Sequence, residues 1–266
     1  MNRDMDLDEW YRLQNGAVRH NRAEIESEYV WLDKAIKLLS DIHIFVNDRN
    51  SPVALIRSNE KQEYPELHQA RNVVVNLAND ALGSLVTGTR LLLFGAHADA
   101  FALVRSAFEG CCNAEYFALH TEDAQHWLDL EKQLSGNLSL NVNSYLRNRK
   151  LSRLQITSIL KVLEKCDGEN RSEFYAKLCN LGAHASPVRV FLRLSPPKGA
   201  VLAAVSVSTP DWSRAKWTQG CAWDLMAVAK YAVTLLPERF PEWFVSEQDL
   251  IRRVKQLEQE FLKLTV

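Results

Sequence analysis

AHADAFALVRSAFEGCCNAEYFALH, residues 96–120, is the stretch that decides the fold of this chain. Its residues are apolar or small on nearly every side, which is the pattern of a helix surrounded by other helices. Gly95 precedes the stretch and is a natural place for the chain to break. We therefore expect 96–120 to be the central helix of a bundle.

Two long helices are predicted on the N-terminal side of this segment, over 22–46 and 65–94. Pro65 occupies the first position, which helices favour for proline. One apolar face per helix follows the helical period: Ile25, Tyr29, Leu32, Ile36, Leu39 and His43 in the first, and Leu67, Ala70, Val74, Leu77, Ala81 and Leu85 in the second. The polar stretches NDRNSP and SNEKQEYP are expected to lie outside both helices.

Further helices are predicted on the C-terminal side. Thr121 is placed to cap a helix over 122–134, and shorter helices are expected over 151–165 and 171–185, before Pro187. Asp211 is placed to cap a helix over 212–236, and Ser246 with Asp249 opens the last helix. That last helix carries a narrow apolar stripe that could dock on the bundle or on another subunit: Leu250, Val254, Leu257, Phe261 and Leu264.

Residues 187–208 interrupt the helical pattern. Val188, Val190, Leu192 and Leu194 alternate with Arg189, Phe191 and Arg193, and after the turn SPPKG a second alternation runs through Val201, Ala203, Val205 and Val207. This pattern predicts a β-hairpin. The expected fold is therefore mainly α, a multi-helix bundle with one β-hairpin inserted before the last two helices. It forms a single domain over 1–266, with the core bundle over 22–187, the hairpin over 187–208 and the C-terminal helices over 211–264.

The composition bounds the class of protein. Of 266 residues, 47% are hydrophobic, and 32 Lys and Arg against 33 Asp and Glu leave a net charge of −1, so no global field attracts nucleic acid or an acidic membrane. The first residues, MNRDMDLDEWYRLQNG, lack the pattern of a signal peptide, and no apolar run could span a bilayer. We expect a cytoplasmic protein that does not enter membranes. The five cysteines include no C-x-x-C pair and are interpreted as core residues.

Motifs of common enzymes are missing from the sequence. There is no G-x-x-x-x-G-K-[ST] loop, G-x-G-x-x-G turn, G-x-S-x-G elbow or H-E-x-x-H pair. The histidines lack the paired spacing of metal ligands. We predict neither a metal nor a cofactor.

Arg105 is the first candidate site residue, because a guanidinium on the central helix has to be paired. Glu109 follows it by four residues and so shares its helix surface, and Tyr116 adds a hydroxyl further along. One interpretation is a structural ion pair that ties the central helix to a neighbour. The other is that Arg105 faces a cleft and binds an anion such as phosphate, with Glu109 holding it in place.

A second candidate site lies in RSEFYAKLCNLGAHASP, residues 171–187. Lys177, Asn180 and His184 fall at helical spacing near the end of the predicted helix. A histidine can move protons near neutral pH, an amide can hold a substrate and a lysine can meet a phosphate, so the trio could support phosphodiester chemistry. The alternative is that Lys177 is a surface residue and that His184 caps the helix.

The two segments LVRSAFEGCCNAEYFAL and FYAKLCNLGAHASP together resemble a group of bacterial helical proteins of unknown activity. In that group an Arg and Glu on one helix are followed, some seventy residues later, by Tyr-x-x-Leu and a His before small residues and proline. More loosely, the chain resembles the HEPN superfamily, helical domains that often act as metal-independent ribonucleases in toxin and antiphage systems. Its arginine precedes a histidine near a helix end, and Lys177 stands in that position relative to His184.

The HEPN resemblance implies that His184 is an acid or base on a ribose hydroxyl, while Arg105 and Lys177 stabilise the phosphate. Arg105, Glu109, Tyr175 and His184 would then converge on one open cleft, at a homodimer interface. Three functions stay open: a partner-binding or regulatory module, which we favour, a HEPN-like ribonuclease acting on RNA, and an enzyme acting on a small anionic substrate. The first predicts that these residues are buried and satisfy one another, and that the exposed apolar area lies on the hairpin or the C-terminal helix. The last requires an enclosed pocket.

Overall fold

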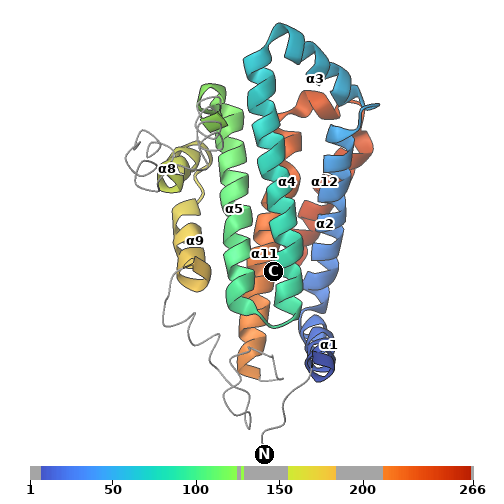
Figure 1. Ribbon diagram of the computed structural model, residues 1–266, viewed down its shortest axis with the longest axis vertical. Coiled ribbons are helices and arrows are strands. Elements are labelled where there is room, and N and C mark those ends of the chain that lie inside the picture. Colours follow the sequence, from blue (N-terminus) through green and yellow to red (C-terminus); the bar gives the residue numbers. More distant parts are fainter. Residues whose placement is uncertain (1–6, 125–126, 129–154, 184–211, 265–266) are drawn as a thin grey trace, which may run out of the picture.

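The computed structural model describes residues 7–124, 127–128, 155–183 and 212–264, and within these ranges the chain is helical (Figure 1). The elements in chain order are α1 (Leu7–Glu24), α2 (Glu26–Asn47), α3 (Pro52–Glu63), α4 (Pro65–Leu93), α5 (His97–Leu119), α8 (Ile156–Asp167), α9 (Arg171–Leu178), the π-helical turn η2 (Cys179–Ala183), α11 (Trp212–Arg239), the 3-10 turn η3 (Pro241–Phe244) and α12 (Gln248–Leu264). None of these helices is long and apolar enough to cross a membrane.

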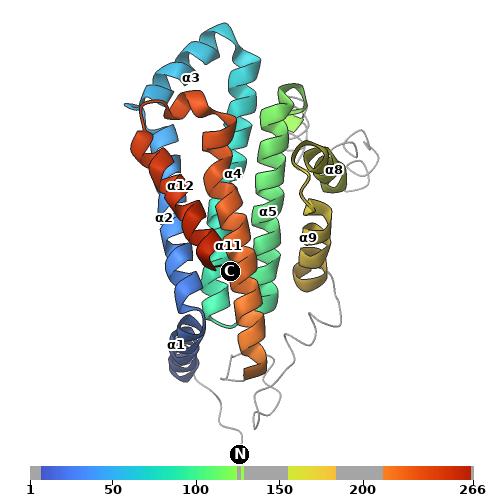
Figure 2. The ribbon, with the colours of Figure 1, turned by 180° about the vertical axis from the view of Figure 1, so that it is seen from behind.

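Four long helices, α2, α4, α5 and α11, run side by side along the long axis of the molecule (Figures 1 and 2). The shorter helices surround them. Helix α3 lies across one end of the bundle, α8 and α9 flank α5 on its outer side, and α12 crosses the face formed by α2 and α11. The described helices share one hydrophobic core.

The prediction of a central helix is confirmed by α5. Buried residues point from it toward α4, α8, α9, η2 and α11, and Phe101 and Phe117 are among the largest fully buried side chains. The preceding break occurs at Gly95, whose φ of 76° is a left-handed conformation that glycine adopts without strain. Gly110 lets α5 approach α4 closely, because an added Cβ would lie 3.3 Å from the carbonyl oxygen of Leu77.

The apolar stripe of α12 packs on the bundle, which answers the question that the sequence left open. Leu250, Val254 and Leu257 are buried against it. On α2, the indole N–H of Trp31 donates to the carbonyl oxygen of Leu257 at 3.1 Å, and the Trp31 ring lies 5.4 Å from that of Phe261.

Two predictions about the N-terminal half are wrong. The first helix does not run unbroken over 22–46, because α1 ends at Glu24 and buried Ile25, with φ −128° and ψ 37°, begins a new helix. The second error is a missed helix, because α3 forms between the two predicted helices and takes in most of SNEKQEYP, whereas NDRNSP is largely the expected loop before it. Ser51 caps α3 by accepting a hydrogen bond from the amide of Ala54 at 3.3 Å, and Pro52 holds the first position. The capping serine and the proline at the first position thus favour a helix in this part of the chain.

The predicted β-hairpin over 187–208 lies outside the described residues. Within the described ranges no strand occurs, so the hairpin finds no support, whereas the mainly helical bundle is confirmed. The helices predicted over 65–94, 171–185 and 212–236 correspond to α4, to α9 with η2, and to α11.

We expect Gly110→Ala to destabilise the protein by about 1–2 kcal/mol, because the new methyl group presses on a helix backbone that cannot move aside. Gly83→Ala is the matched control on α4. Nothing lies within 4 Å of its added Cβ, so it should stabilise the helix by up to about 1 kcal/mol. Urea unfolding followed by circular dichroism measures both changes. Equal gains in stability for the two variants would contradict the close approach of α4 and α5.

Candidate functional site

Three predicted site residues meet between α5 and α9. The Arg105 guanidinium donates to Glu109 at 2.9 Å and to the Tyr175 hydroxyl at 3.0 Å, and that hydroxyl donates to Glu109 at 2.8 Å. The bonds close a ring of three side chains, which we call the Arg105 triad. The Arg105 and Glu109 side chains are 26% and 30% exposed, so the triad lies at the protein surface rather than in a deep cleft.

The electrostatics of the Arg105 triad keep it in one protonation state. Partial burial acts to lower the pKa of Arg105, but the hydrogen bond with Tyr175 and the charge of Glu109 raise it overall. Burial, followed by the bond to Glu109, raises the pKa of Tyr175 above the usual phenol range. Tyr175 is therefore a neutral donor near pH 7. An incoming anion would have to compete with Glu109 for Arg105.

The other predicted site residues lie elsewhere. Lys177 bonds to Asp224 of α11 at 2.6 Å. Tyr116 donates to Asp123 at 2.5 Å near the C-terminal end of α5. Asn180 is an exposed residue of η2, and His184 lies outside the described residues. Within the described chain, the structure therefore brings Arg105, Glu109 and Tyr175 together, and it pairs Lys177 and Tyr116 with other residues.

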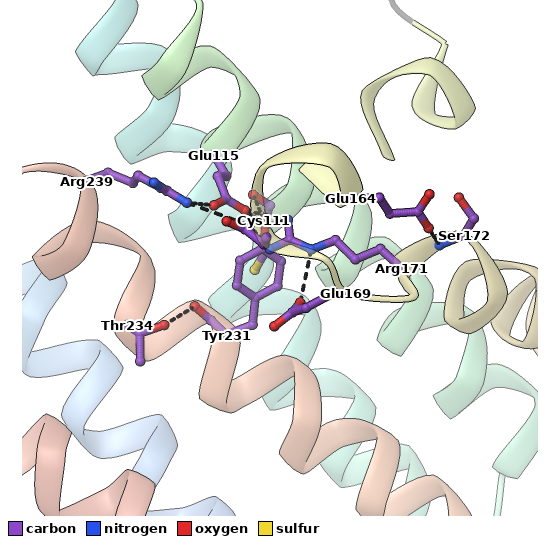
Figure 3. Close-up of polar contacts among 10 residues, drawn as sticks. Cys111, Glu115, Glu164, Glu169, Arg171, Ser172, Tyr231, Thr234 and Arg239 are labelled. Atoms are coloured by element: carbon purple, nitrogen blue, oxygen red, sulfur yellow. Dashed lines mark hydrogen bonds and ion pairs between the residues drawn. The ribbon is translucent and has the colours of Figure 1, made fainter. Parts of the chain in front are cut away.

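A larger polar cluster, which we did not predict, centres on the buried Arg171 (Figure 3). Its guanidinium donates to Glu115 at 2.6 Å, to Asp167 at 2.6 Å and to Glu169 at 3.1 Å, and it also reaches the Tyr231 hydroxyl at 3.1 Å. All five N–H groups of an arginine can donate in this fork geometry. The end of α8, the start of α9, α5 and α11 are thereby joined at one point.

Glu115 is the acidic centre of this cluster, and only 2% of its side chain is exposed. Besides Arg171, it pairs with Arg239 near the end of α11 and accepts a hydrogen bond from Tyr231. Burial raises the pKa of Tyr231 well above its ordinary value, so this hydroxyl remains a donor. We call Glu115, Asp167, Glu169, Arg171, Tyr231 and Arg239 together the ion network.

One residue in the sequence, Glu115, indicates a buried charge of the kind found in the ion network. Glu115 lies on the apolar central helix, four residues after Cys111 and seven after Phe108, which are both buried. A buried carboxylate needs a cationic partner, by the reasoning that we applied to Arg105. The partners could not be named, because Arg171 and Arg239 are distant in sequence and become neighbours only through packing.

A trough with a volume of about 550 Å³ opens beside the ion network. Its floor consists of α11, including Val228 and Tyr231, together with Phe108 of α5. One side is formed by α12 and the other by α9 with the turn that precedes it, and Figure 2 shows α11 exposed between these elements. Phe174 of α9 packs edge-on against Phe108 at 5.0 Å, and Phe261 of α12 also lines the trough.

Carboxylates outnumber cations around the trough. Its lining includes five carboxylate and three cationic side chains, namely Glu115, Asp167, Glu169, Glu238 and Glu258 against Arg171, Lys230 and Arg239. Partial removal from water, followed by the charges of Glu258 and Asp167, raises the pKa of Glu238, and Lys230 lowers it in part. Among the described residues, no group of three or more His, Cys, Asp or Glu is placed to hold a metal ion.

Replacing Arg171 by Met should destabilise the protein by about 3 kcal/mol, because the buried carboxylate of Glu115 loses one of its two cationic partners and keeps only Arg239. Arg105→Met is the matched control, since it removes an ion pair that is partly exposed. Its effect should stay within about 1 kcal/mol. Urea unfolding of both variants gives the comparison. A larger loss for Arg105→Met would show that the Arg105 triad, and not the ion network, carries the packing of α9.

No protein-family model, curated protein or solved structure matches this chain. The resemblances to the bacterial helical group and to the HEPN superfamily therefore stay predictions. Function has to be argued from the trough and from the Arg105 triad.

Proposed function

We propose that this protein is a partner-binding module that holds its partner in the trough over α11. The observation that carries the proposal is the trough itself, a concave surface of about 550 Å³ whose lining combines aromatic rings with several charged groups. Aromatic and charged residues around a water-excluding centre are what binding surfaces use for affinity and orientation.

The state of the predicted catalytic residues supports the same proposal. Arg105, Glu109 and Tyr175 satisfy one another, and Lys177 is paired with Asp224. A binding module predicts that such side chains pair with one another and stabilise helix packing. The burial that it also predicts is not seen, because Arg105 and Glu109 are 26% and 30% exposed. An enzyme acting on a small anion is less well supported, since the carboxylates around the trough would repel an anion.

The rigidity of the trough also favours binding. Its floor is a long helix of the core, and its sides are fixed by the ion network and by the packing of α12 on α2 and α11. A surface that is already formed loses little conformational entropy when a partner binds.

Photo-cross-linking in the source cells tests the proposal. The photoreactive residue p-benzoylphenylalanine would replace Lys230, which lines the trough, or Asn79, an exposed residue of α4. In Figure 1, α4 lies in front and α11 behind, so the two probes are carried by helices at the front and at the back of the bundle. We expect a discrete cross-linked product from position 230 that is missing from position 79. The same product from both positions, or none from position 230, would contradict binding in the trough.

A HEPN-like ribonuclease is the second candidate, and one contact favours it. The π-helical turn η2 packs against α5, which carries Arg105, and it ends at Ala183, the residue before His184. Turns of this kind often occur at functional sites. The charge of Cys179, the first residue of η2, also contributes to raising the pKa of Arg105, so the start of the turn lies near the triad.

The ribonuclease candidate is tested by incubating the protein with total cellular RNA in the presence of a chelator. The candidate predicts cleavage by the wild type that is lost in His184→Ala and falls by a factor of about 100 or more in Arg105→Ala, because a guanidinium would stabilise the phosphate charge. Circular dichroism controls for folding of both variants. An equal rate for wild type and His184→Ala would rule out catalysis by His184.

A further inference from the structure

Two carboxylates of the trough have no ion-pair partner among the described residues, and only the charge of Lys230 offsets part of the effect of their neighbours on Glu238. Glu238 lies near the end of α11 and Glu258 on α12, and among the described residues neither side chain makes an ion pair or a hydrogen bond. Asp167 and Glu169, across the trough, contribute further negative charge. Like charges that crowd together destabilise a folded protein, so this arrangement costs stability unless a ligand neutralises it.

The cations of the trough are already engaged. Arg171 bonds to Glu115, Asp167 and Glu169, and Arg239 bonds to Glu115. Lys230 reaches over the ring of Phe261, with its ammonium nitrogen 5.5 Å from the ring centre. The protein therefore leaves an excess of negative charge beside Glu238 and Glu258.

Aromatic rings lie next to this negative charge. Phe261 forms part of one side of the trough, and Phe174 forms part of the other. The face of an aromatic ring attracts cations, and both rings already hold one of the protein's own, Lys230 over Phe261 at 5.5 Å and Lys177 over Phe174 at 5.8 Å. Carboxylates beside aromatic rings bind an alkyl ammonium or a guanidinium better than they bind a bare metal ion, because the rings also contact the apolar stem.

The length of the trough indicates how large the ligand is. Its lining on α11 extends from Ala227 to Arg239, which corresponds to about 18 Å of helix. A single amine would leave most of that length open. A peptide helix of about three turns would cover it, and could direct basic side chains toward both sides of the trough.

We propose that the trough binds a basic, helical segment of another protein, with one Lys or Arg side chain placed between Glu238 and Glu258 and the apolar surface of the segment against the aromatic rings. This inference rests on the proposed partner-binding function and names the chemistry of the partner. The acidic lining would repel phosphate, so a nucleic acid or an acidic membrane is a poor occupant. A free polyamine has the right charge but lacks the apolar surface that the rings would cover.

Fluorescence anisotropy with a synthetic probe tests the proposal. The probe is a labelled helical peptide of about 14 residues, with leucines on one face and arginines on the other. The control peptide carries glutamate at each arginine position. We expect the basic peptide to bind the wild-type protein, more weakly as salt rises, and the acidic peptide not to bind. Equal binding of both peptides would overturn the proposal.

A pair of double variants localises the binding. Glu238→Gln with Glu258→Gln removes two charges from the trough, and Glu63→Gln with Glu66→Gln removes two exposed charges from the end of the bundle around α3. We expect the first pair to weaken the basic peptide by at least about tenfold and the second by less than about twofold. Thermal unfolding controls for folding, and the first pair should not lower the melting temperature. Equal losses for the two pairs would overturn the site.

A competition experiment distinguishes a basic protein segment from a free polyamine as the occupant of the trough. Spermine is the competitor, and free arginine and magnesium ions are the controls. If spermine binds as tightly as the peptide and displaces it at concentrations at which neither control does, the occupant is a polyamine and the proposal fails. If cross-linking at position 230 succeeds but the basic peptide does not bind, the chemistry named here is wrong while the partner-binding function stands. If cross-linking at position 230 also fails, the proposed function fails with it.

Discussion

The buried carboxylate of Glu115 is the constraint on which the rest of the structure depends. It lies on the most enclosed helix of the bundle, where an unpaired charge would be very costly. Two guanidiniums, from Arg171 and Arg239, and the hydroxyl of Tyr231 converge on it. Because these groups come from α9 and α11, satisfying one carboxylate determines where two further helices lie against α5. An apolar residue at position 115 could pack there, but it would not specify these partners.

The surface features follow from this arrangement. Holding α9 against α5 brings the Tyr175 hydroxyl to Arg105 and Glu109, and it places Phe174 on Phe108. Helix α12 independently covers the other side of α11. A strip of α11 is left open between them, and that strip is the floor of the trough. The binding surface that we propose is therefore a consequence of how the ion network positions the shorter helices.

Charge in this protein matters locally rather than globally. The net charge of −1 gives no general attraction for nucleic acid. The described chain nevertheless gathers five carboxylates and three cations around one trough, and two of these carboxylates make no ion pair within the described residues. A partner is selected by such a local imbalance, because screening by salt confines electrostatic effects to about 10 Å. The proposed basic partner therefore follows from the distribution of charges and not from their sum.

The sequence by itself determined the helical class, the central position of α5, the start of α4 after Tyr64 and the break at Gly95, because apolar period, proline and glycine act over a few residues. It also placed Arg105 and Glu109 on one helix surface. The ion network and the trough were decided only by the tertiary structure. Arg171 and Glu115 are 56 residues apart in the chain, and no local pattern states which guanidinium meets which carboxylate. That choice is made when helices pack and each buried charge has to find a partner.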